Sequence, residues 1–332
     1  MPLQLGIILS SLGILLLGAE LFTNAVEWVG KRFRLSEGAV GSVLAAVGTA
    51  LPETLIPVVA ILFRQGDTGH EIGIGAILGA PFMLATLAFF IIGVTLLLCR
   101  RKAVCARLDV NVEVIGRDLA FFLAVYSLAL AAALTDAYGW KRFFAAVMVM
   151  AYCLYIWLVF TRGGQSAGGL KVDPLFFCRA KMPPPTGLAI SQLVFALSLI
   201  IFGAYIFVGG IAAAAKILGI PALVMALIVA PVATELPEKF NSIIWIFRGK
   251  DTLALGNITG AMVFQSSLIP VLGILFTPWK LTGVALLSAV LAILSAALVL
   301  RQIKSQRALT PFVFLWGGVF YSGFLLAVYL GL

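Results

Sequence analysis

The sequence predicts an all-α integral membrane protein with about ten transmembrane helices, arranged as two inverted five-helix repeats. Three observations support this prediction: the composition, an internal duplication and the distribution of basic residues among the loops. Of the 332 residues, 62% are hydrophobic and 11% are charged, and the mean hydropathy is +1.12, far from the values of a soluble domain. Barrel strands would alternate polar and apolar residues over about ten positions between turns, and the chain has no such alternation.

Individual helices are predicted from the length of the apolar stretches. A transmembrane helix needs about 20 predominantly apolar residues, and ten stretches of the chain satisfy this requirement. They lie at 3–30, 37–63, 72–98, 117–135, 142–161, 188–214, 221–247, 252–276, 281–300 and 309–331.

The two halves of the chain share a sequence pattern, which is free of gaps around one duplicated motif and needs a shift of four residues further on. At a constant offset of 185 residues, Leu51-Pro52-Glu53 recurs as Leu236-Pro237-Glu238. The matching positions also include Gly18, Phe22 and Thr49, which recur as Gly203, Phe207 and Thr234. We therefore predict a first repeat at 1–161, a cytoplasmic linker at 162–187 and a second repeat at 188–332.

Lysine and arginine predict the orientation, because loops rich in them stay in the cytoplasm. Alternate loops hold 17 of the 23 basic residues, and the opposite set of loops holds only 5. Both termini are therefore expected outside the cytoplasm, in a multi-pass protein of the cell membrane. With five helices in each half, an odd number, the two halves must be upside down relative to each other.

Several classes of function are excluded by the same reading. The net charge of +9 reflects the loop bias, and nucleic-acid binding would need a basic soluble face. No Ser-His-Asp set, phosphate loop or zinc motif is present, and the four cysteines show no CxxC spacing. We expect no enzyme activity, no catalytic residues and no cofactor. The expected partners are inorganic cations and the lipid bilayer.

The duplicated Leu-Pro-Glu segments are the predicted ion site. An ionisable residue near the bilayer centre costs roughly 2.5–3.5 kcal/mol, and a proline leaves a backbone carbonyl without its helical donor. We therefore expect each helix to loosen at the motif, where oxygens lining a cavity would converge. Such an oxygen-only set suits hard cations such as calcium or sodium. The predicted oxygens belong to Gly48, Thr49, Glu53, Ala233, Thr234 and Glu238.

These segments resemble the motifs of the cation/calcium antiporter superfamily, which includes the sodium/calcium exchangers and their bacterial relatives. The resemblance lies in Gly48-Thr49-Ala50-Leu51-Pro52-Glu53, in Ala233-Thr234-Glu235-Leu236-Pro237-Glu238 and in Gly256-Asn257-Ile258-Thr259-Gly260. It implies that Glu53 and Glu238 bind calcium, with help from Thr49 and Thr234, while sodium or protons compete for the same oxygens.

The resemblance also implies polar ligands from the helix that follows each motif. In the first half that stretch is Gly79-Ala80-Pro81-Phe82-Met83-Leu84, which has no such side chain. In the second half only Gln265 remains of the usual set, with Asn257 in the preceding motif. Because these ligands are missing, the usual number of sodium sites is not expected to carry over, and protons become an alternative counter-ion to sodium.

The second copy adds two charged residues, Glu235 and Lys239. A lysine at membrane depth must pair or lose its proton. One hypothesis is that Lys239 partly neutralises Glu235, which leaves about two negative charges for one divalent ion. The alternative is that Lys239 extends to the cytoplasmic interface and Glu235 is an additional ligand.

The first helix carries Glu20, Asn24 and Glu27, whose spacing places them on one face. Such a face lines either a water path or a neighbouring helix. We expect Glu20 and Asn24, together with Lys239, to act in gating or access; a structural hydrogen bond is the alternative for Glu20. Separately, Gly75 and Gly79, and Gly256 and Gly260, have the small-xxx-small spacing of close helix packing. The alternative is that these glycines let the backbone approach the ion.

These features together predict a secondary antiporter that exports calcium or a related cation in exchange for sodium or protons. Inverted repeats around a midplane site are typical of alternating access. A proton-coupled divalent cation exchanger without sodium sites is the first alternative. A cation channel, which would also use acidic rings, is the second.

Overall fold

The computed structural model describes residues 2–32, 50–64, 66–99, 108, 110–162, 174–178 and 185–331, without the side chains at 30–32, 160, 162 and 236–239. All secondary structure in these residues is helical. Eight helices are long and apolar enough to cross a membrane. Their segments are α1 (Pro2–Arg32), α5 (Asp67–Met83) continued by η2 (Leu84–Ala88) and α6 (Phe89–Leu98), α7 (Val112–Ala133), α8 (Tyr138–Arg162), α9 (Thr186–Leu218), α11 (Asp251–Phe276), α12 (Gly283–Gln306) and α13 (Pro311–Tyr329).

Two further helices contain shorter apolar stretches, α4 (Leu51–Phe63) and α10 (Ala222–Phe247). The prediction of an all-α membrane protein is confirmed. Of the predicted range 37–63, only the part from residue 50 onward lies within the described residues. The total of ten spans and the inversion of the two halves stay predictions.

Two helix ends show the usual capping chemistry. Asn111 precedes α7, and its Oδ1 accepts hydrogen bonds from the backbone N of Glu113 and of Val114, both at 3.2 Å. Gly219 ends α9 with a φ of +66°, a left-handed conformation that favours glycine. These caps set where the spans stop and the loops begin.

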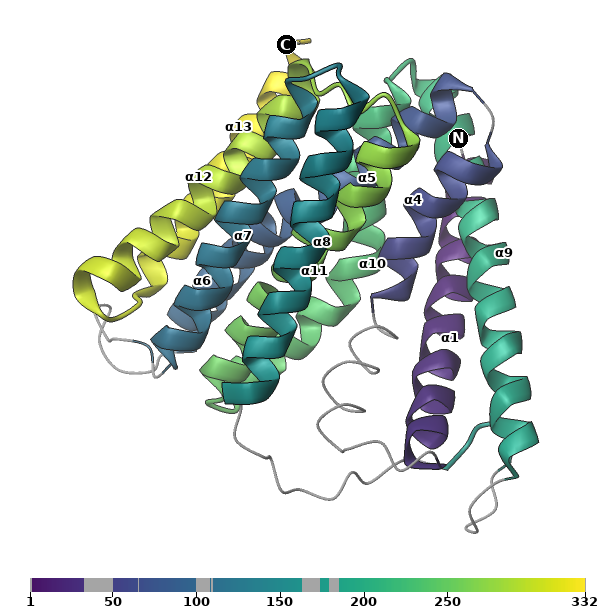
Figure 1. The fold of residues 1–332 in the computed structure, drawn as a ribbon, viewed down its shortest axis with the longest axis horizontal. Helices are drawn as coiled ribbons and strands as arrows, with labels where there is room; N and C mark the ends of the chain where they lie inside the picture. Colours follow the sequence, from purple (N-terminus) through teal and green to yellow (C-terminus); the bar gives the residue numbers. More distant parts are fainter. Residues whose placement is uncertain are drawn as a thin grey trace.

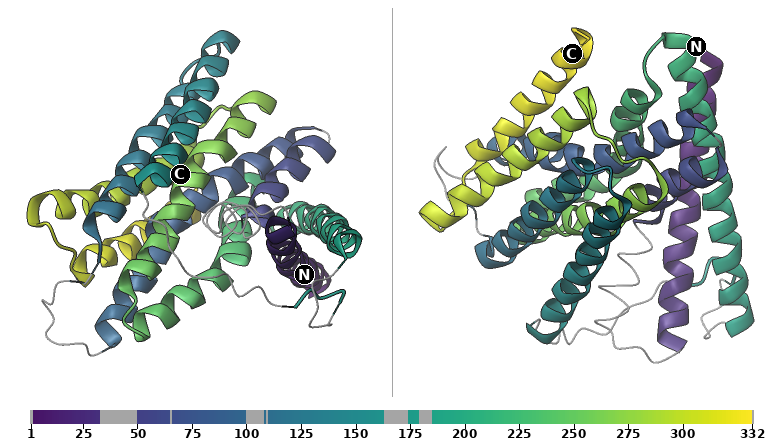
Figure 2. Two further views of the ribbon diagram at one scale, coloured as in Figure 1. Left: turned by 60° about the horizontal axis from the view of Figure 1, so that its bottom comes forward. Right: turned by 45° about the horizontal axis from the view of Figure 1, so that its top comes forward.

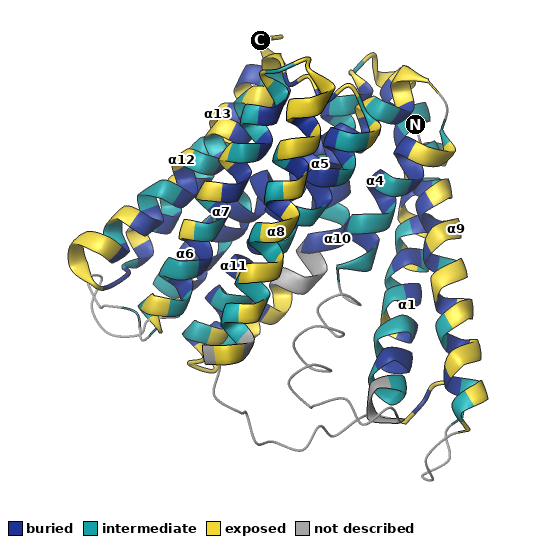
Figure 3. Cartoon of the chain, viewed as in Figure 1, coloured by how far each residue is buried: buried dark blue, intermediate teal, exposed yellow. Residues whose placement is uncertain are grey.

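The helices pack as two groups around two apolar cores. Helices α1 and α9 lie side by side and stand apart from the larger bundle (Figure 1), which the views in Figure 2 also show. Parts of α4, α5 and α10 join them in one core, whereas the other core is built from α5–α8 and α10–α13. Outward faces of α8, α9 and α12 are exposed (Figure 3) and carry large apolar side chains such as Trp157, Phe202 and Leu294. An apolar surface of this kind suits contact with lipid.

The contact between α1 and α9 is reciprocal in the duplicated positions. A Cβ added to Gly18 would lie 2.7 Å from Ile200 Cγ1, and one added to Gly203 would lie 3.1 Å from Leu15 Cγ. Gly203 and Ile200 are the counterparts of Gly18 and Leu15 at the offset of 185 residues. Each glycine thus contacts the counterpart of the residue that its own counterpart contacts, as expected for two segments related by a two-fold axis.

Both chain ends lie at the same end of the bundle, at the top of Figure 1. The helix ends that lead into the basic loops lie at the opposite end, at the C-termini of α1, α6, α8, α10 and α12. The two termini and these helix ends thus lie at opposite ends of the bundle.

Two of the four predicted packing glycines make close contacts. Added Cβ atoms on Gly75 and Gly79 would lie 2.3 Å from the carbonyl oxygens of Leu223 and Leu227 in α10. The packing prediction is therefore confirmed in α5. For Gly256 and Gly260 it is not confirmed, because an added Cβ there meets nothing within 4 Å among the described residues.

This difference gives a matched pair of variants. We expect Gly79→Ala to lower the thermal unfolding midpoint in detergent, because overpacking costs about 1–3 kcal/mol and outweighs the gain of up to ~1 kcal/mol in helix propensity. Gly260→Ala should keep or raise the midpoint. Equal midpoints for the two variants would show that the α5–α10 contact does not need the glycine.

The expected loosening of the second motif is wrong. Helix α10 runs without a break through Pro231 and Pro237. The carbonyl of Leu227, which Pro231 deprives of its helical donor, lies against Gly79. A close helix contact, rather than an ion, therefore covers this carbonyl.

The irregular backbone occurs instead between α5 and α6. The π-helical turn η2 follows Pro81, and such turns leave carbonyls in need of donors. The hydroxyl of Thr86 donates to the carbonyl of Phe82, and that of Ser295 in α12 donates to the carbonyl of Ala85, both at 2.5 Å. The distortion is thus satisfied by side chains within the bundle.

Candidate functional site

A cavity of about 320 Å³ lies between α1, α4 and α10. Both halves of the chain contribute to it, since Glu53 comes from the first Leu-Pro-Glu segment and Thr234 from the second. Its lining comprises Leu16, Ala19, Glu20, Thr23, Asn24, Glu27, Pro52, Glu53, Phe176 and Thr234. This cavity is the candidate cation site.

Helix α4 begins at the first motif. Leu51 is its first residue, and Pro52 lies where a helix needs no backbone N–H. Glu53 falls in the first turn and is buried, with 7% of its surface exposed. Unpaired backbone N–H groups and the helix dipole favour a negative charge at this position. The proline therefore starts a helix and places the carboxylate of Glu53 at its N-terminus, beside the cavity.

The polar face predicted on α1 lines the same cavity. Glu20, Asn24 and Glu27 all contribute to its wall, which confirms the prediction that their spacing places them on one face. Together with Glu53 they put three carboxylates around the cavity, and its described lining includes no basic side chain. Clustered carboxylates in a low-dielectric cleft concentrate cations.

Glu20 differs from its neighbours on this face. It is exposed and makes no hydrogen bond or ion pair in the part of the chain that the structure describes. The structural hydrogen bond considered as an alternative role is therefore absent there. Asn24 is buried and does make such bonds, with the backbone of residues 174–176.

A second polar group lies between α10 and α11. Glu235 is 1% exposed, and its Oε1 accepts a hydrogen bond of 3.1 Å from Nε2 of Gln265, itself 2% exposed. Thr234 uses its hydroxyl as a donor to the carbonyl of Ala230, at 3.1 Å. The structure thus brings Glu235 and Gln265 together, beside the cavity wall rather than in it.

Other predicted site residues lie elsewhere. Asn257 donates from Nδ2 to Oγ of Ser242 in α10 at 3.4 Å and does not line the cavity. Ala233 is partly buried against the core that contains α1 and α9. Gly48 and Thr49 lie outside the described residues, as do the side chains of Glu238 and Lys239 in α10.

The stretch after the first motif contributes apolar packing. Phe82 is 1% exposed and packs against the rings of Tyr321 and Phe324, and Met83 and Leu84 belong to the same core. The structure therefore agrees with the sequence that this part of α5 and η2 has no polar ligand.

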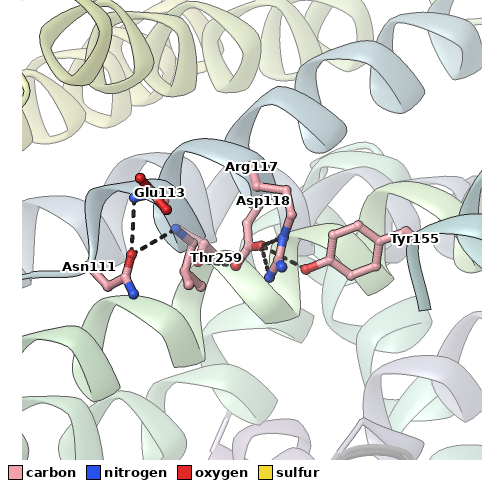
Figure 4. A network of polar contacts seen from close by, with 7 residues as sticks. Asn111, Glu113, Arg117, Asp118, Tyr155 and Thr259 are labelled. Atoms are coloured by element: carbon pink, nitrogen blue, oxygen red, sulfur yellow. Dashed lines mark hydrogen bonds and ion pairs between the residues drawn. The ribbon is translucent and has the colours of Figure 1, made fainter. Parts of the chain in front are cut away.

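The sequence analysis missed a buried carboxylate, Asp118 in α7 (Figure 4). It is 3% exposed and accepts hydrogen bonds from three helices. Tyr155 Oη in α8 donates to Oδ1 at 2.7 Å, Thr259 Oγ1 in α11 donates to Oδ2 at 2.9 Å, and Arg117 adds two longer bonds to Oδ1. An acid in a predicted span is the signal that could have revealed it.

Comparisons with known proteins agree with this architecture. The family described as sodium/calcium exchanger protein matches residues 3–161 and 188–331. CaxA from Alkalimonas amylolytica, named as a candidate antiporter, is 27% identical over 307 residues, which cover 90% of each chain. The inner membrane protein YrbG of Escherichia coli (strain K12) is 25% identical over 289 residues, or 86% of this chain and 83% of YrbG.

Two solved structures share the fold. The H+/Ca2+ exchanger CAX gives a TM-score of 0.75 over 98% of this chain and 84% of that chain, at 18% identity. The sodium-calcium exchanger NCX_Mj gives 0.56 over 96% of both chains, also at 18% identity. The matched regions leave out only the connector and a few terminal residues. The chain therefore belongs to the sodium/calcium exchanger protein family, within the cation/calcium antiporters, and is a multi-span membrane transport protein.

Proposed function

We propose that this protein exports calcium, or a related cation, in exchange for sodium or protons by alternating access. The observation that carries the proposal is the carboxylate-lined cavity to which both halves contribute, through Glu53 and Thr234. Hard cations prefer carboxylate and hydroxyl oxygens. A cavity with fixed negative charge also resists being emptied in the membrane, which favours exchange over release.

Within this proposal, Glu53 and Glu238 are the principal ligands. The N-terminus of α4 orients Glu53, and Glu238 lies four residues after Thr234 on α10, one helical turn away along the same face. Glu235 and Gln265 form a supporting pair next to this centre. The other proposed ligands are Gly48, Thr49, Ala233 and Thr234; Asn257 bonds to Ser242 instead and is not among them.

The halves 1–161 and 188–332 are proposed to be inverted repeats with both termini outside the cytoplasm. The reciprocal contacts of Gly18 and Gly203 support a two-fold relation. The helix ends that lead into the basic loops lie opposite the termini, which supports the orientation.

Proton coupling without sodium sites is the second candidate. The observation that favours it is the apolar packing of Phe82, Met83 and Leu84, where further oxygen ligands would be needed for additional sodium ions. Protons would instead compete directly with calcium for the carboxylates.

Transport in reconstituted vesicles separates these possibilities. Radiolabelled calcium uptake is measured with an imposed sodium gradient, a proton gradient or no gradient. We expect saturable uptake that depends on one of the two gradients. Uptake that needs no opposing ion and does not saturate would indicate a channel and contradict the proposal.

Glu20 offers a separate test of access. Because Glu20 is exposed at the cavity and makes no hydrogen bond or ion pair among the described residues, Glu20→Gln should leave equilibrium calcium binding intact and slow exchange. Calorimetric binding and vesicle uptake are compared for the same preparation. A variant that no longer binds calcium would overturn the gating role and make Glu20 a ligand.

A further inference from the structure

Residues 174–178 of the connector between the two halves lie next to the cavity. Phe176 is part of the cavity lining. Leu175 is 1% exposed, and its carbonyl accepts a hydrogen bond from the backbone N of Cys178 at 2.9 Å, which closes a turn. We call residues 174–178 the strap.

Two buried amide side chains hold the strap by its backbone. Asn24 in α1 accepts a hydrogen bond from Phe176 N at 3.3 Å and donates to the carbonyl of Pro174 at 3.4 Å. Gln192 in α9 accepts from Phe177 N at 3.0 Å. The strap is therefore fixed to α1 and α9 together.

The two amides are also joined to each other. Nε2 of Gln192 donates to Oδ1 of Asn24 at 3.0 Å and to the carbonyl of Leu21 at 2.9 Å. Asn24 is 7% exposed and Gln192 is fully buried. Buried amides are costly unless they are hydrogen-bonded, and apolar residues would join α1 to α9 at no such cost. The two amides, unlike apolar residues, can also hydrogen-bond the backbone of the strap and hold it in place.

The neighbouring rings of the strap point to different surroundings. Phe176 borders the cavity, whereas Phe177 packs against Phe195 of α9 with ring centroids 5.6 Å apart. The strap lies at the end of the bundle where α8 stops and α9 begins, at the bottom of Figure 1, the same end as the basic loops.

We propose that the strap controls access to the cavity from the side of the basic loops: Phe176 covers the entrance, and Asn24 and Gln192 position it. This inference rests on the proposed function for its meaning in transport, since Phe176 and Glu53 line the same cavity. Release of the three backbone bonds, at Phe176 N, Phe177 N and the carbonyl of Pro174, would uncover the entrance without unfolding any helix.

Cysteine labelling tests the cover directly. Cys99, Cys105, Cys153 and Cys178 are replaced by serine, and Thr23→Cys places a single reporter in the cavity wall. A membrane-impermeant maleimide is applied to oriented vesicles from each face. We expect Phe176→Ala to speed labelling several-fold from the face of the basic loops only.

The control is Phe177→Ala, which removes the adjacent ring and should leave the labelling rate unchanged. Gln192→Leu, which lies outside the cavity wall, should speed labelling in the same direction as Phe176→Ala. Equal rates for Phe176→Ala and Phe177→Ala would overturn the strap as a cover. Labelling does not require transport, so a failure of calcium exchange with a positive labelling result would refute the proposed function alone.

Discussion

Glu53→Gln is expected to abolish most calcium exchange while the protein still folds. The change keeps the size of the side chain and removes its charge from the wall of the cavity. Losing a charged ligand interaction costs about 1.5–3 kcal/mol, which corresponds to a roughly tenfold to hundredfold weaker affinity. Initial rates of radiolabelled calcium uptake at fixed gradients give the measurement.

A matched control is Glu71→Gln in α5, which makes the same chemical change at an exposed position away from the candidate cavity. It should transport calcium at the rate of the unmodified protein. If Glu53→Gln transports as fast as Glu71→Gln, the cavity is not the cation site.

Asp118→Asn is expected to give the largest loss of stability among single polar changes. Four hydrogen-bond donors from Arg117, Tyr155 and Thr259 converge on this carboxylate. Arg117 is partly exposed, so no buried charge is left unpaired, and losing the hydrogen bonds to the charged acceptor should cost about 1.5–3 kcal/mol. Tyr155→Phe, which removes only one donor, should cost about 1 kcal/mol. Unfolding in a denaturing detergent gives both values.

The same substitution at Asp136 is the control. Asp136 forms an exposed ion pair with Lys280 at 3.0 Å, and this contact lowers the pKa of its carboxyl. Exposed pairs contribute little, so Asp136→Asn should leave stability nearly unchanged. Similar losses for Asp118→Asn and Asp136→Asn would mean that the network seen in Figure 4 does not hold α7, α8 and α11 together.

Hydropathy was sufficient to predict the eight long apolar helices of the described residues, because length and apolar content are what a bilayer requires of a helix. The polar face of Glu20, Asn24 and Glu27 was also predictable, since residues three and four apart share a helix face. Both inferences depend only on the local sequence, the first on its apolar content and the second on its spacing.

Proline was a poorer guide. Pro52 begins a helix and Pro237 lies inside one, and sequence alone does not distinguish a helix start from a break. Which neighbour covers a carbonyl that has lost its helical donor depends on tertiary packing. Gly79 lies against the carbonyl of Leu227, and no sequence motif predicts this contact.

Hydrogen-bond partners that are distant in the sequence could not be predicted either. Asp118 meets Thr259 across 141 positions, and Gln192 meets Asn24 across 168. Each is visible in the sequence as a polar residue within an apolar run, which signals a buried partner without identifying it. The tertiary fold alone determines which helix faces supply these donors and acceptors.

Calcium binding to the purified protein tests the central claim most directly, that one acid from each half holds the same ion. Calorimetric titrations are run on the unmodified chain, Glu53→Gln, Glu238→Gln and the double variant. We predict that each single change weakens binding at least about tenfold and that the double variant binds no calcium. Unchanged calcium affinity in either single variant would contradict a site shared by the two halves.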